Sequence, residues 1–312
     1  MQILGDTGNP RPVSPSCYIC RKNLDFSRSR HTIQAMSQAS PTSLQRWQPT
    51  RHWYQNRWQL LSLPLLVFLT LPLIALLLRT PPSLLLAHLN DPVVLSALQV
   101  SLSTTFIATL VIILTGTPVA FFLSRNHLPG QRIIDTLIDL PTVLPPAVAG
   151  LALLLAFGRR GLLGNYLDLF GIQIAFTRTA VIMAQVFIAA PFYVKSAVIG
   201  FSGIDPELEQ AASLDGASGW HIFRYVLMPL SWSALVSGSM LSWARALGEF
   251  GATIIFAGNF PGRTQTMPLA IYLGFEINLE VSLTLSVILL AFSFIALLIV
   301  KWILSRQETR VS

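Results

Sequence analysis

The sequence predicts an all-α protein that crosses a membrane six times, and three observations support that prediction. Hydrophobic residues make up 53% of the 312 residues and charged residues only 11%, whereas soluble chains carry about 25% charged residues. Six stretches are nearly free of charge, and each approaches or exceeds the roughly 20 apolar residues that a spanning helix needs. Backbone polar groups in lipid have to bond within their own segment, so these stretches are expected to be helices. The composition excludes a soluble enzyme and a disordered chain.

The six expected spans follow one another between residues 60 and 300. They cover residues 60–78, 93–123, 140–158, 179–201, 230–257 and 281–300. Charged residues flank three of the stretches on both sides. Asp91 and Arg125 flank the second stretch, Asp139 and Arg159 the third, and Glu280 and Lys301 the sixth. Lys195 lies near the end of the fourth stretch, and Arg245 and Glu249 lie inside the fifth. Prolines within several stretches are compatible with a helix bundle, because neighbouring helices can satisfy the freed carbonyls.

Residues 1–59 are expected to form a basic, disordered cytoplasmic arm. They hold eight Arg or Lys residues against two Asp residues and show no sustained apolar period. Cys17 and Cys20 form a C-x-x-C pair, but a zinc site needs four ligands and no second pair follows, so we predict no metal site. Met36 is a candidate for the natural start of the chain.

The basic arm places the N-terminus in the cytoplasm under the positive-inside rule, and six crossings return the tail, residues 305–312, to the same side. Five arginines oppose the rule, because this topology puts them on the outer side. They are Arg79, Arg159, Arg160, Arg178 and Arg263.

The connection between the fourth and fifth stretches contains signals for a folded helix–turn–helix. Asp205 is a helix N-cap and Pro206 takes the first helical position. Gly216 supplies a left-handed residue that ends a first short helix, and Ser218 is expected to cap a second one that ends before Pro229. Since a plain connection needs only a few residues, this folded loop indicates a docking element for another protein.

This loop, residues 205–229, resembles the cytoplasmic loop signature of ABC importer permeases, E-A-A-x-x-x-G followed by a distant L-P. Glutamine stands here for the family glutamate and methionine for the leucine before the proline. The positions concerned are Glu209, Gln210, Ala211, Ala212, Gly216, Met228 and Pro229. The resemblance implies a type I ABC importer permease fold over about residues 92–304, within a transmembrane domain of residues 60–304. It also implies that the loop couples to an ABC ATPase.

Residues 244–272, A-R-A-L-G-E-F-G-A-T-I-I-F-A-G-N-F-P-G-R-T-Q-T-M-P-L-A-I-Y, closely resemble the molybdate importer permeases of the sulfate/molybdate group. Sulfate permeases are similar up to Gly251 but usually differ in the N-F-P-G-R-T-Q-T stretch. The resemblance implies import of molybdate, with tungstate as a co-substrate. The implied partners are a second permease copy, a pair of ATPase subunits, an extracytoplasmic molybdate-binding protein and membrane lipid. The implied location is the inner or plasma membrane.

Arg245 and Glu249 are four residues apart, so they are expected to share one helix face with Ser242. Charges at membrane depth are costly and usually face a cavity or each other. This face could therefore line the translocation path, with Arg245 offering positive potential to a dianion. A structural ion pair between two spans and a small-residue packing seam are the alternatives.

The outer loop after the fifth stretch, residues 259–266, is expected to serve the binding protein. It begins at Asn259 and contains a turn at Gly262, which would leave Arg263 exposed at the tip. Arg263 could meet an acidic edge of the binding protein or attract the anion. A solvated arginine without a role is the alternative.

The sequence carries no nucleotide-binding G-x-x-x-x-G-K-[ST] motif and no recognisable catalytic set, so we expect neither enzymatic activity nor a cofactor. No nucleic-acid partner is expected, because most of the basic excess sits in the arm. ATP hydrolysis is assigned to a separate subunit. The alternative functions are a sulfate or thiosulfate ABC permease and, from another class, a secondary transporter that needs no ATPase.

Overall fold

The structure is a computed structural model that describes residues 51–125 and 130–311. The Cys17–Cys20 pair, Met36 and most of the predicted arm lie outside the described residues. The chain divides into two compact units, residues 1–68 and 69–312.

The described residues of the first unit form the beginning of helix α2 (Arg51–Arg79). This helix starts within the segment that was expected to be a disordered arm. Residues 51–63 contain neither glycine nor proline. Once an apolar helix is nucleated, each added residue gains a hydrogen bond at little cost, so the helix extends into the polar segment.

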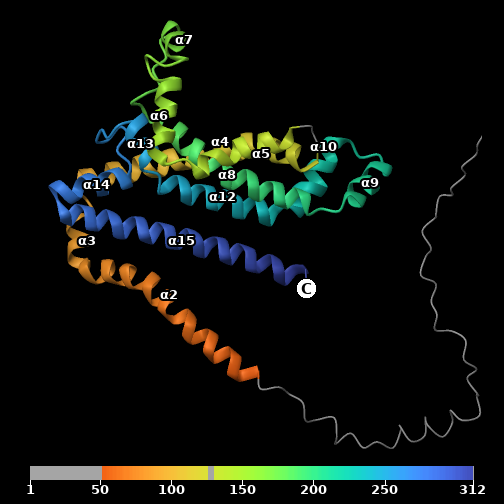
Figure 1. Ribbon diagram of the computed structural model, residues 1–312, viewed down its shortest axis with the longest axis horizontal. Helices are drawn as coiled ribbons and strands as arrows, with labels where there is room; N and C mark the ends of the chain where they lie inside the picture. Colours follow the sequence, from red (N-terminus) through yellow and green to blue (C-terminus); the bar gives the residue numbers. More distant parts are fainter. Residues whose placement is uncertain (1–50, 126–129, 312) are drawn as a thin grey trace, which may run out of the picture. The chain divides into compact units, whose positions relative to one another are not determined.

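The second unit consists of the rest of α2 and a series of further helices (Figure 1). They are α3 (Pro82–His88), α4 (Pro92–Arg125), α5 (Gln131–Val143), α6 (Pro146–Phe157), α7 (Gly164–Leu169), α8 (Arg178–Ser202), α9 (Pro206–Leu214), α10 (Gly219–Ile222), the π-helical turn η2 (Phe223–Leu227), α11 (Met228–Leu230), α12 (Trp232–Leu247), α13 (Gly251–Phe256), α14 (Met267–Ile277) and α15 (Leu279–Val311). Helix α15 continues past residue 304, so the predicted tail is helical as far as Val311.

Four helical segments of the described chain are long and apolar enough to cross a membrane. They are Leu61–Arg79, Pro92–Arg125, Arg178–Ser202 and Leu279–Trp302. The pair α5 and α6 passes the same test together and gives a fifth crossing if it is counted as one span. The protein is therefore a polytopic helical membrane protein, whereas six crossings stay a prediction.

The third predicted stretch is not one continuous helix, and this part of the prediction is wrong. The α5 and α6 axes are bent by 115° at the break between Val143 and Pro146. Leu144 and Pro145 have extended backbones, with ψ angles of 135° and 131°. A residue before proline is disfavoured in the α region, and two consecutive prolines apply that restriction twice. An apolar run alone carries no signal of such a turn.

The fifth predicted stretch is also divided, into α12 and α13. The helix ends at Leu247 and resumes at Gly251, and Phe250 between them has φ −128° and ψ −54°. Glycine at positions 248 and 251 weakens the helix on both sides of the break.

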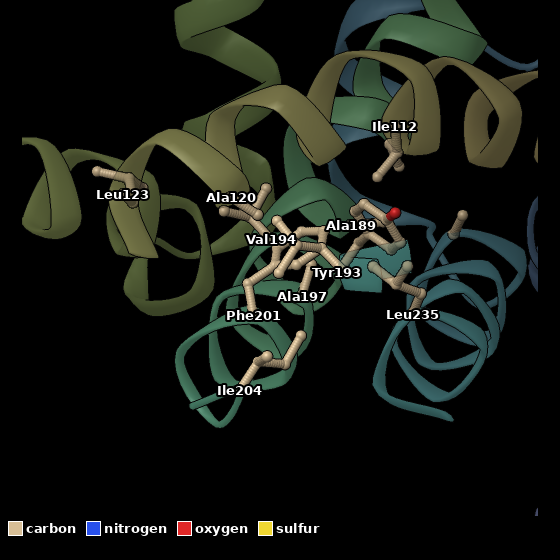
Figure 2. Close-up of a cluster of buried hydrophobic side chains, with 12 residues drawn as sticks. Ile112, Ala120, Leu123, Ala189, Tyr193, Val194, Ala197, Phe201, Ile204 and Leu235 are labelled. Carbon is tan, nitrogen blue, oxygen red and sulfur yellow. The ribbon is translucent and has the colours of Figure 1, made fainter. Parts of the chain in front are cut away.

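Helix α8 lies at the centre of the second unit, with α4 and α12 packed along it. Figure 2 shows the buried cluster between them, to which Ala120 of α4, Leu235 of α12, and Tyr193 and Phe201 of α8 all belong. The Tyr193 hydroxyl is 2.6 Å from the Thr117 hydroxyl of α4. The buried Tyr193 oxygen therefore has a partner and fixes the register of α4 against α8.

Close contact between α6 and α13 depends on Gly150. A Cβ added at Gly150 would lie 2.6 Å from the carbonyl oxygen of Ala252. We expect Gly150→Ala to lower the detergent melting temperature, because overpacking against a backbone atom typically costs about 1–3 kcal/mol. Gly203→Ala is the matched control, since its added Cβ meets its nearest atom at 3.4 Å, an ordinary contact. Equal melting temperatures for the two variants would contradict the close α6–α13 packing.

Candidate functional site

The loop over residues 205–229, here called the docking loop, begins as its sequence predicts. The Asp205 side chain accepts a hydrogen bond of 2.9 Å from the Glu207 N–H, and Pro206 occupies the first turn of α9. Gly216 has φ +84°, and the Ala217 N–H bonds the Ala212 carbonyl at 3.1 Å. The N-cap and the left-handed glycine are therefore confirmed.

The second half of the docking loop differs from the prediction. Ser218 stands at the N-cap position of α10, but its hydroxyl contacts His221 Nδ1 at 2.6 Å and caps no backbone N–H. The expected end before Pro229 is wrong, because the helical run continues through η2 and α11 to Leu230. The Met228 N–H bonds the Phe223 carbonyl, five residues back. A π-turn of this kind is wider than an α-turn and accommodates Pro229, which has no N–H to donate.

The docking loop is tied firmly to the helices above it. Glu209 forms an ion pair with Arg125 at the end of α4. The Phe223 ring lies 5.3 Å from the Phe121 ring of α4 and 6.2 Å from the Phe201 ring of α8. One charge contact and one aromatic cluster therefore connect the loop to both helices.

The outward surface of the docking loop mixes polar residues with exposed apolar side chains. Gln210 and Ala211 are exposed, Ala212 is half-buried, and Leu214 is 88% exposed. Apolar side chains that stand out from a folded loop are typical of protein contact sites. Sequence reasoning missed both Leu214 and the Arg125–Glu209 pair. An apolar residue in the last turn of a polar helix was the available signal for Leu214.

Glu249 lies in the break between α12 and α13, where it has two partners. It is 1% exposed, and its Oε2 atom accepts a 2.9 Å bond from Arg245 Nη1. Its Oε1 atom accepts a 2.9 Å bond from the Ala252 N–H at the start of α13. The predicted continuous helix face through Glu249 is therefore wrong. The pair joins two consecutive segments of the chain, and the carboxylate caps the second of them.

Ser242 lies in a packing seam between α12 and α8. Its side chain is fully buried, and its hydroxyl donates a 2.9 Å bond to the Ala189 carbonyl. One turn away, a Cβ added at Gly238 would lie 2.7 Å from Ser196 Cβ. Small residues let the two helices approach closely here. In this conformation Ser242 faces α8 rather than an open path, and the packing-seam alternative describes this part of the helix.

The segment 259–266 lies at the end of the bundle opposite the docking loop, close to α6, α7 and α13 (Figure 1). The expected turn is present, with φ +70° at Gly262. Arg178 donates a 2.8 Å bond to the Gly262 carbonyl and a 3.3 Å bond to the Arg263 carbonyl. Asn259 is half-buried and Arg263 is exposed. The structure thus leaves the Arg263 side chain free to meet a partner or an anion.

Residues 116–309 match the family described as the binding-protein-dependent transport system inner membrane component. The chain belongs to this family. Among its relatives, the molybdenum transport system permease ModB of Mycobacterium tuberculosis is 39% identical over 75% of this chain and 88% of the relative. ModB of Escherichia coli K12 is 38% identical over 68% of this chain and 95% of the relative. A protein of Chlorokybus atmophyticus named a probable sulfate transport system permease is 40% identical over 72% and 78%.

Solved structures of ABC transporters contain chains with the same fold as this chain. A chain of a bacterial ABC transporter involved in the import of alginate superposes with a TM-score of 0.66 at 15% identity, over 84% of this chain and 97% of that chain. A chain of the MetNI methionine ABC transporter gives a TM-score of 0.55 at 19% identity, over 69% and 95%. The fold is that of the type I ABC importer permeases.

The permease shows no site for a metal within its described residues. No group of three or more His, Cys, Asp or Glu side chains there is placed to hold an ion. The bundle has three features that a transport subunit could use. The anchored docking loop lies at one end, and the exposed arginines Arg159 and Arg263 lie at the other. The buried carboxylate of Glu249 lies at the break between α12 and α13.

Proposed function

We propose that this chain is the membrane permease subunit of an ABC importer that carries molybdate, with tungstate as a co-substrate, into the cytoplasm. The observation that carries the proposal is its 38–39% identity to proteins named molybdenum transport system permeases over 68–75% of its length. The anchored docking loop supports the ABC part of the proposal, because exposed apolar side chains on a folded loop are typical of a contact with another protein. The stretch 244–272 supports molybdate over other oxyanions.

The geometry suggests how the chain converts ATP hydrolysis into transport. Two copies form the path, an ATPase subunit binds the docking loop of each copy, and an extracytoplasmic binding protein delivers the oxyanion. The ATPase binds the exposed surface around Ala211 and Leu214. Motion of the loop passes through Glu209 and Phe223 into α4 and α8. Because both termini are assigned to the cytoplasm, the loop faces the ATPase and Arg263 faces the binding protein.

Sulfate or thiosulfate import is the second candidate, and a specific observation favours it. The relative named a probable sulfate permease is as similar to this chain as the molybdenum permeases are. A secondary transporter is the alternative from another class. It has no use for an anchored docking loop, and the family membership gives it no support.

The decisive experiment is reconstitution of the permease in lipid vesicles with its ATPase and its binding protein. We expect ATP-dependent uptake of labelled molybdate that excess tungstate inhibits and excess sulfate does not. Uptake that sulfate inhibits as strongly as tungstate would identify a sulfate-type permease. Uptake without the ATPase would identify a secondary transporter.

Charge reversal at Arg263 tests the outer loop. We expect Arg263→Glu to reduce uptake most at low salt, because the Debye length falls from about 30 Å at 0.01 M to about 8 Å at 0.15 M. Arg160→Glu is the matched control, since it makes the same charge change at another exposed arginine in the same region. Initial uptake rates over a salt series measure the effect. If the Arg263→Glu rate equals the wild-type rate at every salt concentration, Arg263 is a solvated arginine without a role.

A further inference from the structure

A pocket of about 440 Å³ lies at the end of the bundle opposite the docking loop. It is formed by the end of α6, by α7, by the segment leading into α8 and by the segment 259–266. Arg159 and Arg263 line it from segments that are far apart in the sequence, and Gln173 and Thr177 line it as well. We call it the Arg159–Arg263 pocket.

The two arginines that line this pocket are unpaired among the side chains that the structure describes. Neither guanidinium has a described carboxylate within 4.0 Å or a described hydrogen-bond partner. Arg125, Lys195 and Arg245 each form an ion pair with a carboxylate. Both guanidinium groups are therefore available to an anion in the pocket.

The walls of the pocket are held in place by the surrounding chain. Arg178 bonds the carbonyls of Gly262 and Arg263 and so fixes the turn that carries Arg263. Phe176 has a positive φ of 62°, the only such non-glycine residue in the described chain, and its N–H bonds the Phe256 carbonyl at 3.2 Å. A strained residue persists only where its surroundings determine it, and such residues gather at ligand sites.

The charge around the pocket favours an anion but not a tightly bound one. Four arginines occur in the two segments that surround it, and Asp168 is the one carboxylate among its lining residues. Guanidinium groups present planar forks of N–H donors that match the oxygen atoms of an oxyanion. Asp168 lowers the positive potential of the pocket, which weakens the binding of an anion. The volume leaves room for an anion with part of its hydration shell.

We propose that the Arg159–Arg263 pocket binds a small tetrahedral oxyanion between its two guanidinium groups, as a weak site on the permease itself. Its placement on the outer side rests on the proposed function. The chemistry of the pocket does not depend on which oxyanion is carried. A permease with such a site raises the local concentration of its cargo at this end of the bundle, independently of the binding protein.

Arginine labelling tests this proposal in the intact permease–ATPase complex in lipid nanodiscs. Phenylglyoxal modifies free guanidinium groups, and peptide mass spectrometry gives the labelling rate of each arginine. We expect millimolar molybdate or sulfate to slow labelling of Arg159 and Arg263 several-fold compared with chloride at equal ionic strength. Arg160, which does not line the pocket, should be labelled at the same rate in all three salts.

Two variants test whether protection of Arg159 depends on the other arginine of the pocket. Arg263→Gln should abolish the protection of Arg159, whereas Arg160→Gln should leave that protection intact. Equal labelling rates in oxyanion and chloride would overturn the proposal. Protection by the binding protein alone, with none by free anion, would also overturn it, because the pocket would then be a protein contact.

Uptake measured on the same complex, with its binding protein, separates this proposal from the proposed function. ATP-dependent molybdate uptake without protection of Arg159 would overturn the pocket and leave the function standing. Protection of both arginines without ATP-dependent uptake would support the pocket and contradict the function.

Discussion

Gly216→Val is expected to reduce ATP-driven uptake at least tenfold while the permease still inserts and folds. Gly216 has φ +84°, in the left-handed region, where a β-branched residue is an outlier. No atom lies within 4 Å of an added Cβ there, so the effect comes from the backbone and not from a clash. The turn has to rearrange, which moves Leu214 and breaks the Ala217 to Ala212 hydrogen bond. Uptake in vesicles and co-purification of the ATPase measure the loss.

Gly219→Val is the matched control for this experiment. Gly219 lies in the same loop and also has no atom within 4 Å of an added Cβ, but its φ is not in the left-handed region. The same side chain is therefore added with the same free space and without backbone strain. Normal uptake by a normally expressed Gly216→Val variant would show that the docking loop does not act as proposed.

The second large effect is expected at Arg245 and Glu249. Breaking a buried pair by removing one partner costs roughly 3–5 kcal/mol. We place Glu249→Ala near the lower end of that range, because the Arg245 side chain is 31% exposed. Glu249→Ala also removes the acceptor for the Ala252 N–H. Arg245→Gln leaves the 1% exposed Glu249 carboxylate without its cation, so the detergent melting temperature should fall for both variants and at least as far for Arg245→Gln as for Glu249→Ala.

The double variant Arg245→Gln, Glu249→Gln separates a structural role from a transport role. Glutamine keeps an oxygen that can accept from the Ala252 N–H, and neither side chain is left with an unpaired charge. We expect this variant to fold with a melting temperature near wild type and to lose most of its uptake, because the charge offered to the dianion is gone. A stable double variant with wild-type uptake would remove both residues from the transport path.

The start of α9 and the turn at Gly216 could be predicted from the sequence because their causes are local. Asp205 caps its own helix two residues on, and the left-handed glycine needs only its own φ angle. The same local chemistry could not locate the partners of Glu209 and Phe223. Those partners lie on α4 and α8, and only packing brings them together.

The breaks in the third and fifth stretches show why apolar runs are a limited guide. Hydropathy measures how favourable a segment is in lipid, and a bent pair of helices satisfies that measure as well as a straight one does. Pro145 was a visible signal for the first break, although prolines elsewhere in this chain, such as Pro191, lie inside continuous helices. The second break lies where the Glu249 carboxylate accepts a bond from the Ala252 N–H and so caps the next helix. An apolar run gives no sign of this contact.

The docking loop separates its inward and outward contacts by residue. Glu209 and Phe223 point into the chain's own helices, whereas Ala211 and Leu214 face away from them. Partner choice and fold can therefore be engineered separately. A chimaera that exchanges only the outward residues should acquire the ATPase preference of the donor permease. One that exchanges the whole loop has to bring matching residues at positions 121, 125 and 201 as well.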